Sequence, residues 1–419
     1  MIKFLKYSLF FVISIGITTL YAQSNKRPYR NNEKTDLLIQ KANNIQKQDP
    51  SNALDYIEQA LELSIKNKDK NGEANCYYSL GLINYQLKNY SFAIEKYYKA
   101  LKIFIKINAH KDELKAYNAI GSSYEAKNEH IKSLEYYNKY LQKAENLNIE
   151  DNIIDAKNCI ARVNLKLNNV DESLKNYKSV LKQQKKRSNK KGVIEASDNI
   201  GNVYLQQDNN ETALDYFQES QSVANEINDS KSITQSLQNI SNVHRANKNY
   251  DKEIETRQKS LELNEQQNNL AVQSAENYEI ANTLLEQNNP EGAIKYLEKS
   301  IDIATKTGAL EDKSKATQVL SEAYNKIGNQ EKAIQTYEEY IAIKDSLLKQ
   351  KEKELLASLD LKDEILEKQN RIEMLEKNRD AKEKEIQLKE KGLKQQRIVI
   401  YSLSISILIL IIAAFFIRQ

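Results

Sequence analysis

The sequence predicts an all-α protein, built as a right-handed solenoid of helical hairpins, then a long charged helix and one transmembrane helix. Its clearest feature is a small residue that recurs every 40 residues, each time directly after a branched apolar residue. The positions are Gly81, Gly121, Ala161, Gly201, Ser241, Ala281 and Ser321. Only 10 Gly and 3 Pro occur in 419 residues, and strand signals are lacking. A fixed period of this length is the signature of stacked repeats.

A second small residue and an aromatic or large apolar residue complete each repeat. The small residue comes 12 positions after the first one, and the large residue four positions later. The large residues are Tyr97, Tyr137, Tyr177, Phe217, Leu297 and Tyr337. Small residues let two helices approach closely, and residues four apart share a helical face. We therefore expect these tyrosines, Tyr337 included, to lie in the core. Glu253 and Arg257 break both rules in one repeat, where we expect more polar packing.

These residues resemble the tetratricopeptide repeat. Its first helix carries Leu-Gly-x-x-Tyr, and its second helix carries Ala, an aromatic residue and Ala, as at Gly81, Ala93, Tyr97 and Ala100. The closing Pro of that family is absent, and the period is 40 where the usual one is about 34. The resemblance implies stacked helical hairpins whose first helices line a concave groove.

The N-terminal residues resemble a secretory signal peptide. Lys3 and Lys6 precede an apolar run over 7–20, so we predict a signal peptide at 1–22, with an uncleaved anchor as the alternative. A polar arm is predicted at 23–33, and the solenoid at 34–344 as about eight repeats of 40. The first repeat is degenerate, with Lys41 at its small site, as expected of a terminal repeat.

Residues 345–396 predict a long charged helix with a weak coiled-coil seam. Apolar residues such as Leu361, Ile365 and Ile372 follow a heptad spacing in places, but Lys368 and Arg379 share that seam. A parallel homodimer through this helix is one interpretation. A single solvated helix held by charge pairs four residues apart is the other.

Residues 398–417 contain no charge, and a helix of that length spans a bilayer. With a signal peptide, this helix would anchor the chain in a bacterial inner membrane with the repeats on the extracytoplasmic, periplasmic side. Basic residues cluster before the span and only Arg418 follows it, which favours the opposite orientation. A tail-anchored cytosolic protein is therefore the alternative.

Composition and motifs argue against several functions. A net charge of +4 on 62 basic and 58 acidic residues gives no electrostatic basis for binding nucleic acid. No phosphate-binding loop, metal-binding His motif or nucleophile elbow is present, and none of the three histidines has a second ligand at helical spacing. We expect no enzyme activity, no metal and no cofactor. Cys76 and Cys159 are expected to be buried and unpaired.

The candidate binding site lies on the first helix of each repeat. Polar residues stand just after the small site or four residues earlier, so both positions face the same way. They are Asn118, Asn158, Asp198, Asn202, Gln238, Asn242 and Asn282. Side-chain amides donate and accept hydrogen bonds, which suits gripping the backbone of a peptide or protein ligand. Because the chain is rich in Asn throughout, a solvated surface without a ligand is the alternative.

The order of segments resembles the extracytoplasmic sensory half of bacterial tetratricopeptide sensor histidine kinases, or of related membrane-bound helix-turn-helix regulators. The stretch Lys344-Asp345-Ser346-Leu347-Leu348 leads into the charged helix and is typical of the corresponding junction in those proteins. The sequence contains no kinase or DNA-binding domain after the predicted span. The resemblance implies a receptor or scaffold in signal transduction, which acts through partners or is the sensory part of a longer protein.

Overall fold

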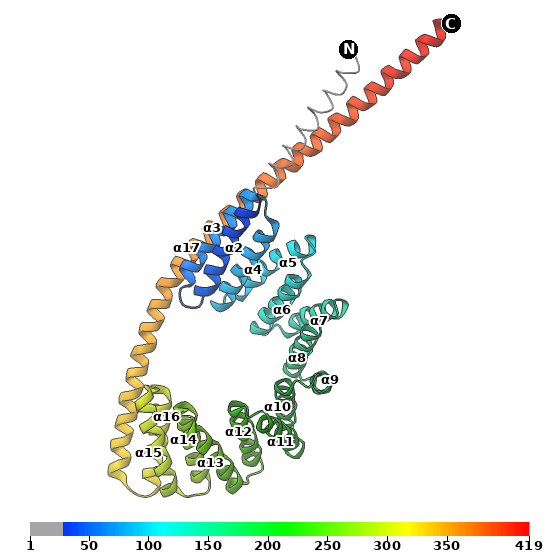
Figure 1. The fold of residues 1–419 in the computed structure, drawn as a ribbon. Coiled ribbons are helices and arrows are strands. Elements are labelled where there is room, and N and C mark those ends of the chain that lie inside the picture. Colours follow the sequence, from blue (N-terminus) through cyan, green and yellow to red (C-terminus); the bar gives the residue numbers. More distant parts are fainter. Residues whose placement is uncertain (1–27, 419) are drawn as a thin grey trace. The chain divides into compact units, whose positions relative to one another are not determined.

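The computed structural model describes the backbone of residues 28–418 and the side chains from 33 to 406, except residue 404. Over residues 28–418 the chain forms sixteen α-helices and no strand, and successive antiparallel helices pack as hairpins (Figure 1). The helices are α2 (Pro28–Ile45), α3 (Pro50–Asn67), α4 (Lys70–Gln86), α5 (Tyr90–Lys106), α6 (His110–Ala126), α7 (His130–Asn146), α8 (Glu150–Lys166), α9 (Val170–Lys186), α10 (Lys190–Gln206), α11 (Asn210–Glu226), α12 (Ser230–Ala246), α13 (Tyr250–Gln266), α14 (Leu270–Glu286), α15 (Pro290–Thr307), α16 (Leu310–Lys326) and α17 (Gln330–Arg418). The predicted all-α helical solenoid is confirmed.

The chain divides into two compact units, and each is described by itself. Unit 1 contains α2 to α5, the start of α6 up to Ala116, and the part of α17 from Asp360 onward. Unit 2 runs from Tyr117 to Leu359 and contains the rest of α6, the helices α7 to α16, and the first part of α17.

The turns between helices share one backbone conformation. From α4 to α14 each helix has 17 residues, and three residues connect it to the next. From the turn after α3 to the turn after α16, one residue of each turn has a positive φ, at intervals of 20 residues. These residues are Lys68, Lys88, Asn108, Asn128, Asn148, Asn168, Ser188, Asp208, Asn228, Lys248, Asn268, Asn288, Gly308 and Gly328. Asparagine is the commonest among them because it tolerates the left-handed region better than most residues.

Backbone hydrogen bonds at these turns close each helix. In the turn after α4 the amide of Asn89 donates to the carbonyl of Asn84 (2.8 Å), and the amide of Lys88 donates to Tyr85 (3.0 Å). This is the Schellman arrangement, which satisfies the last carbonyl groups of the helix. The same pattern recurs along the chain, so the turns set a uniform hairpin geometry.

The predicted contact between small and aromatic residues is confirmed. A Cβ atom placed on Gly201 of α10 would lie 2.6 Å from a ring carbon of Phe217 on α11. The same atom on Gly121 would lie 2.8 Å from the ring of Tyr137. The aromatic ring therefore occupies the space that a side chain would need. Cys76 and Cys159 are buried and free, as expected.

Tyr337 departs from this pattern, and its predicted place in the core is wrong. The equivalent Tyr97, Tyr137 and Phe217 are at most 1% exposed, whereas Tyr337 is 52% exposed. In the other hairpins the first helix of the next hairpin covers this position. Helix α17 instead continues without a turn past Tyr337, so no such helix packs there.

The two predicted membrane-related segments are at the ends of the chain. The predicted signal peptide at 1–22 lies outside the described residues, and α2 begins at Pro28, inside the predicted polar arm. Among the helices that the structure describes, none is long and apolar enough to cross a membrane. Most side chains of the segment 398–417 lie outside the described residues, so the transmembrane helix stays a prediction.

Candidate functional site

The predicted groove residues of unit 2 lie on the first helices of their hairpins, and several of them connect one hairpin to the next. The Asn118 amide on α6 donates to the Asp155 carboxylate on α8 (3.1 Å). The Gln238 amide on α12 donates to Glu276 on α14 (2.9 Å). Because both amides donate hydrogen bonds to the next hairpin, they stabilise the stacking of hairpins.

Asp198 on α10 combines burial with sparse hydrogen bonding. Burial raises its pKa to about 6, against weaker lowering effects of hydrogen bonds from Ser220 and Asn239. The Asn239 amide donates to Asp198 over a long distance of 3.4 Å. The carboxyl group therefore changes its charge just below neutral pH.

The remaining asparagines of the predicted site are not tied to neighbours. Asn202 is exposed and Asn282 is half-buried, and neither has a side-chain hydrogen bond among the described residues. The side-chain oxygen of Asn158 is buried without a hydrogen-bond partner in the described part of the chain. Asn202 and Asn282 therefore keep their hydrogen-bonding capacity for a ligand or for water, whereas the buried oxygen of Asn158 is not accessible to a ligand.

Asn242 belongs to a buried charge cluster centred on Arg257 of α13. The Arg257 guanidinium donates to Glu253 (2.9 Å), to Glu276 (3.1 Å) and to the side-chain oxygen of Asn242 (3.1 Å). Arg257 and Glu276 are both buried, and Ser260 also donates to Glu276 (2.8 Å). This is the repeat in which Glu253 and Arg257 break the sequence pattern, and the break marks a charged interface with the next hairpin.

An open pocket lies on the first helices of unit 1. Its volume is about 300 Å³, and α2, α4, α6 and the end of α5 line it. Apolar side chains in it come from Ile39, Leu82 and Phe104. Its polar residues are Asp36, Gln40, Asn43, Asn75, Tyr78, Ser79, Asp112 and Lys115. Tyr78 and Leu82 occupy the same repeat positions on α4 as Asp198 and Asn202 do on α10.

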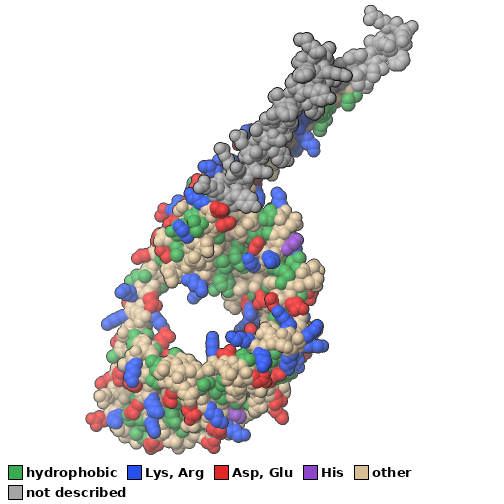
Figure 2. Space-filling view, viewed as in Figure 1, with side chains coloured by type: hydrophobic (Ala, Val, Ile, Leu, Met, Phe, Trp, Pro, Cys, Tyr) green, Lys and Arg blue, Asp and Glu red, His purple; other side chains and the backbone are tan. Residues whose placement is uncertain are grey.

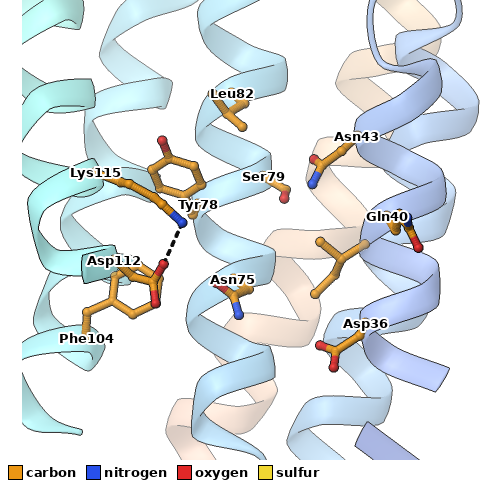
Figure 3. Close-up of a pocket in the computed structure, with 11 residues that line it drawn as sticks. Asp36, Gln40, Asn43, Asn75, Tyr78, Ser79, Leu82, Phe104, Asp112 and Lys115 are labelled. Carbon is orange, nitrogen blue, oxygen red and sulfur yellow. Dashed lines mark hydrogen bonds and ion pairs between the residues drawn. The ribbon is translucent and has the colours of Figure 1, made fainter. Parts of the chain in front are cut away.

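Figure 3 shows how the pocket side chains are arranged. Asp36 and Asn43 point from α2 toward α4, and Lys115 pairs with Asp112 on the opposite side (2.9 Å). Burial and the nearby Asp69 carboxylate raise the pKa of Asp36. Sequence reasoning missed the α2 residues because the first repeat is degenerate. Only Tyr78 and Leu82 could have been found, from their spacing to Gly81.

A second structural feature of unit 1 is the contact between α17 and the hairpins α2–α3 and α4–α5. Glu376 of α17 accepts hydrogen bonds from Lys96 of α5 at 2.9 and 3.2 Å, and it also pairs with Lys99. The side chains of Lys96 and Glu376 are 6% and 5% exposed, so this ion pair is buried. Ile365 and Ile372 of α17 are buried as well.

Further ion pairs fix this segment of α17 in place. Lys368 pairs with Asp55 of α3 (2.7 Å), and Arg371 pairs with Asp55 and Glu58 (3.2 Å each). Arg379 donates to the Tyr77 hydroxyl (3.0 Å) and also pairs with Glu73. We call these partners on α3, α4 and α5 the α17 docking surface.

Part of the predicted coiled-coil seam therefore has a partner within the chain. The seam residues Ile365, Lys368, Ile372 and Arg379 are the ones that face the docking surface. The sequence revealed the stripe but not its partner. In this structure the part of the seam up to Arg379 is occupied, whereas Ile386 and Leu393, farther along the same helix, are exposed. The homodimer predicted through the seam stays a prediction.

Charges elsewhere are mixed. Figure 2 shows acidic and basic side chains interspersed on the visible face, without a large area of one sign. No group of three His, Cys, Asp or Glu side chains could hold a metal ion within the described residues.

Comparison with known families explains the repeat. The model of the tetratricopeptide repeat family matches residues 41–106, 152–226, 192–266 and 272–346, which together cover more than half of the chain. This chain belongs to the tetratricopeptide repeat family. A comparison with curated proteins found no match.

Solved structures agree on the fold of this tetratricopeptide-repeat protein. The apo form of the quorum sensor NprR from B. thuringiensis is 16% identical with a TM-score of 0.52, and the match covers 80% of this chain and 94% of that one. A Signal Transduction ATPase with Numerous Domains, which has a tetratricopeptide repeat sensor and comes from Pyrococcus horikoshii, is 15% identical with a TM-score of 0.53. That match covers 79% of this chain and 52% of the other. At these identities the likeness shows the fold alone.

Proposed function

We propose that this tetratricopeptide-repeat protein binds a peptide or an extended protein segment on the first helices of its hairpins, with the pocket of unit 1 as the anchoring site. The pocket carries the proposal because it combines apolar Leu82 and Phe104 with polar side chains from three successive first helices. Pockets of this composition hold an apolar side chain while their polar groups orient the ligand. In unit 2, Asn202 and Asn282, which have no side-chain hydrogen bond among the described residues, would contact the backbone of a peptide bound there.

A peptide-binding experiment tests this function. A random 12-residue peptide library is panned against the full chain, and enriched peptides are titrated against two variants on α2. Asn43→Trp places a bulky ring at the pocket, whereas Asn44→Trp changes the adjacent exposed residue, which does not line it. We expect Asn43→Trp to weaken binding at least tenfold and Asn44→Trp to leave it unchanged. Equal affinity for both variants would place the ligand elsewhere.

We further propose that the chain is a membrane-anchored receptor or scaffold in signal transduction, with its repeats on the extracytoplasmic side. The uncharged segment 398–417 and the apolar run at 7–20 support this. NprR is a quorum sensor, and the P. horikoshii protein has a tetratricopeptide repeat sensor, in keeping with a sensory role. Protease added after outer-membrane permeabilisation should digest the repeats. Full protection would favour the tail-anchored cytosolic alternative.

A further inference from the structure

Helix α17 carries a stripe of exposed apolar side chains where it forms the last hairpin of unit 2. Ile334, Ile341, Leu348 and Leu355 follow one another at intervals of seven residues and are 62%, 42%, 62% and 60% exposed. Tyr337, 52% exposed, lies between the first two. This spacing places them on one face of the helix, as in the seam of a coiled coil. We call these five residues the exposed stripe.

The equivalent positions of the interior hairpins show that a helix is the partner that packs on this face. Leu181 and Leu261, four and two repeats before Ile341, are buried, and Ile301, one repeat before it, is half-buried. The residue equivalent to Tyr337 is buried in the other hairpins because a helix of the next hairpin packs on it. The face of α17 therefore has the composition of a helix–helix interface but no helix on it in unit 2.

Open space lies beside the stripe. A pocket of about 240 Å³ separates the start of α16 from α17, lined by Glu311, Ser314 and Lys315 on one side and by Lys344, Leu347, Leu348 and Lys351 on the other. Part of Leu348 thus faces a groove between two helices. A further helix can lie along α17 at this place.

We propose that a second copy of α17 occupies the exposed stripe, antiparallel to the first, and that the chain dimerises through this contact. With Ile341 level with Leu348 of the second copy, the same register places Ile334 level with Leu355 of that copy. A two-fold axis then passes between residues 344 and 345, so both copies use the same surface, as in most homodimers.

Charge favours the antiparallel direction. In that register Lys344 lies level with Asp345 of the second copy, and Lys351 lies level with Glu338. In a parallel pair in register, Lys344 would instead lie beside Lys344 of the second copy, and Lys351 beside Lys351. Such pairs of like charges destabilise helix pairs. Lys351 now pairs with Glu311 (3.1 Å), but both side chains are more than 60% exposed, so exchanging this partner costs little.

The exposed stripe is long enough to form a helix–helix contact. The stripe from Ile334 to Leu355 spans about 32 Å of helix at 1.5 Å per residue. This dimer does not use the seam on Ile365 and Ile372, which the docking surface of unit 1 already covers. Both contacts can therefore exist in one molecule.

The first test measures the mass of the full chain in detergent by analytical ultracentrifugation. We expect a dimer at micromolar concentration and at least a hundredfold higher dissociation constant for Ile341→Glu. The control is Leu388→Glu, which alters an exposed apolar residue of α17 outside the stripe and should leave the dimer intact. Circular dichroism should be unchanged in both, because neither side chain is buried. A monomeric wild-type chain, or a dimer insensitive to Ile341→Glu, overturns the proposal.

The second test determines the direction of the helices. A mixture of Ile334→Cys and Leu355→Cys chains should form a disulfide-linked heterodimer, since these positions are level in the antiparallel register. Leu355→Cys alone should not crosslink, because its own copy lies about 32 Å away along the axis. The native cysteines are buried and do not compete. Crosslinking of Leu355→Cys with itself would show a parallel pair and refute this arrangement.

Discussion

The ion pair between Lys96 and Glu376 makes a quantitative prediction for the docking of α17. Glu376→Ala removes the partner of a lysine that is only 6% exposed. Breaking a buried pair on one side costs about 3–5 kcal/mol. Lys96 keeps a second contact to the half-exposed Glu95 (3.3 Å), so we take the lower end of this range. About 3 kcal/mol corresponds to roughly a hundredfold change in an equilibrium constant.

Hydrogen exchange of the amides in 361–379, followed by mass spectrometry, measures this change. We expect roughly hundredfold faster exchange in Glu376→Ala, because the undocked segment becomes a solvated helix. The exposed Glu390→Ala on the same helix should exchange at the wild-type rate.

A double variant separates the effect of lost packing from the effect of a buried charge without a partner. Replacing both partners, Lys96→Met with Glu376→Met, leaves no buried charge between them and should recover most of the protection. The reasoning is refuted if Glu376→Ala keeps wild-type protection, or if the double variant exchanges as fast as the single one.

Three further predictions concern the repeats. Gly201→Ala should destabilise the solenoid by about 1–3 kcal/mol in urea unfolding, because its Cβ would meet the Phe217 ring; Gly392→Ala, with open space around it, should cause no loss. Asp198→Asn should stabilise the chain by up to about 3 kcal/mol above pH 6 and by little below pH 4. The reason is that a folded pKa of about 6, raised from 3.8, makes stability fall as pH rises through this window. A pH-independent gain would contradict it. Ser188→Gly should raise stability by roughly 0.5–1 kcal/mol, because Ser188 has φ 54° and Gly adopts this conformation without steric cost. A loss of stability there would show that the serine side chain matters.

The repeat geometry could be predicted from the sequence because it depends on local spacing. The distance from Gly201 to Phe217 is fixed within one hairpin, so the small residue and the aromatic ring had to meet. Tyr337 has the same local sequence context, yet it is exposed because burial depends on a helix that follows. Whether this position is buried therefore depends on the hairpin that follows, and the local sequence pattern carries no information about that hairpin.

The candidate site was predictable only in part. The spacing of Gln238 and Asn242 predicts a shared helical face, but it does not predict that Glu276 and Arg257 hydrogen-bond with their side chains. Those partners come from other helices, and their pairing depends on how hairpins stack. The docking of α17 was even less predictable from the sequence, because Lys368 and Asp55 are 313 residues apart. A heptad pattern cannot distinguish such a partner from a second copy.

The left-handed turn residues every 20 positions have a consequence for how such a chain changes length during evolution. Because each helix and its turn occupy the same number of residues, a gene segment encoding 40 residues can be duplicated or lost without disturbing the backbone of the hairpins that remain. The junction between α13 and α14 is an exception. There Arg257 and Glu276 belong to neighbouring hairpins, and inserting a copy between them would leave a buried charge without its partner. We expect gains and losses of hairpins to spare this junction.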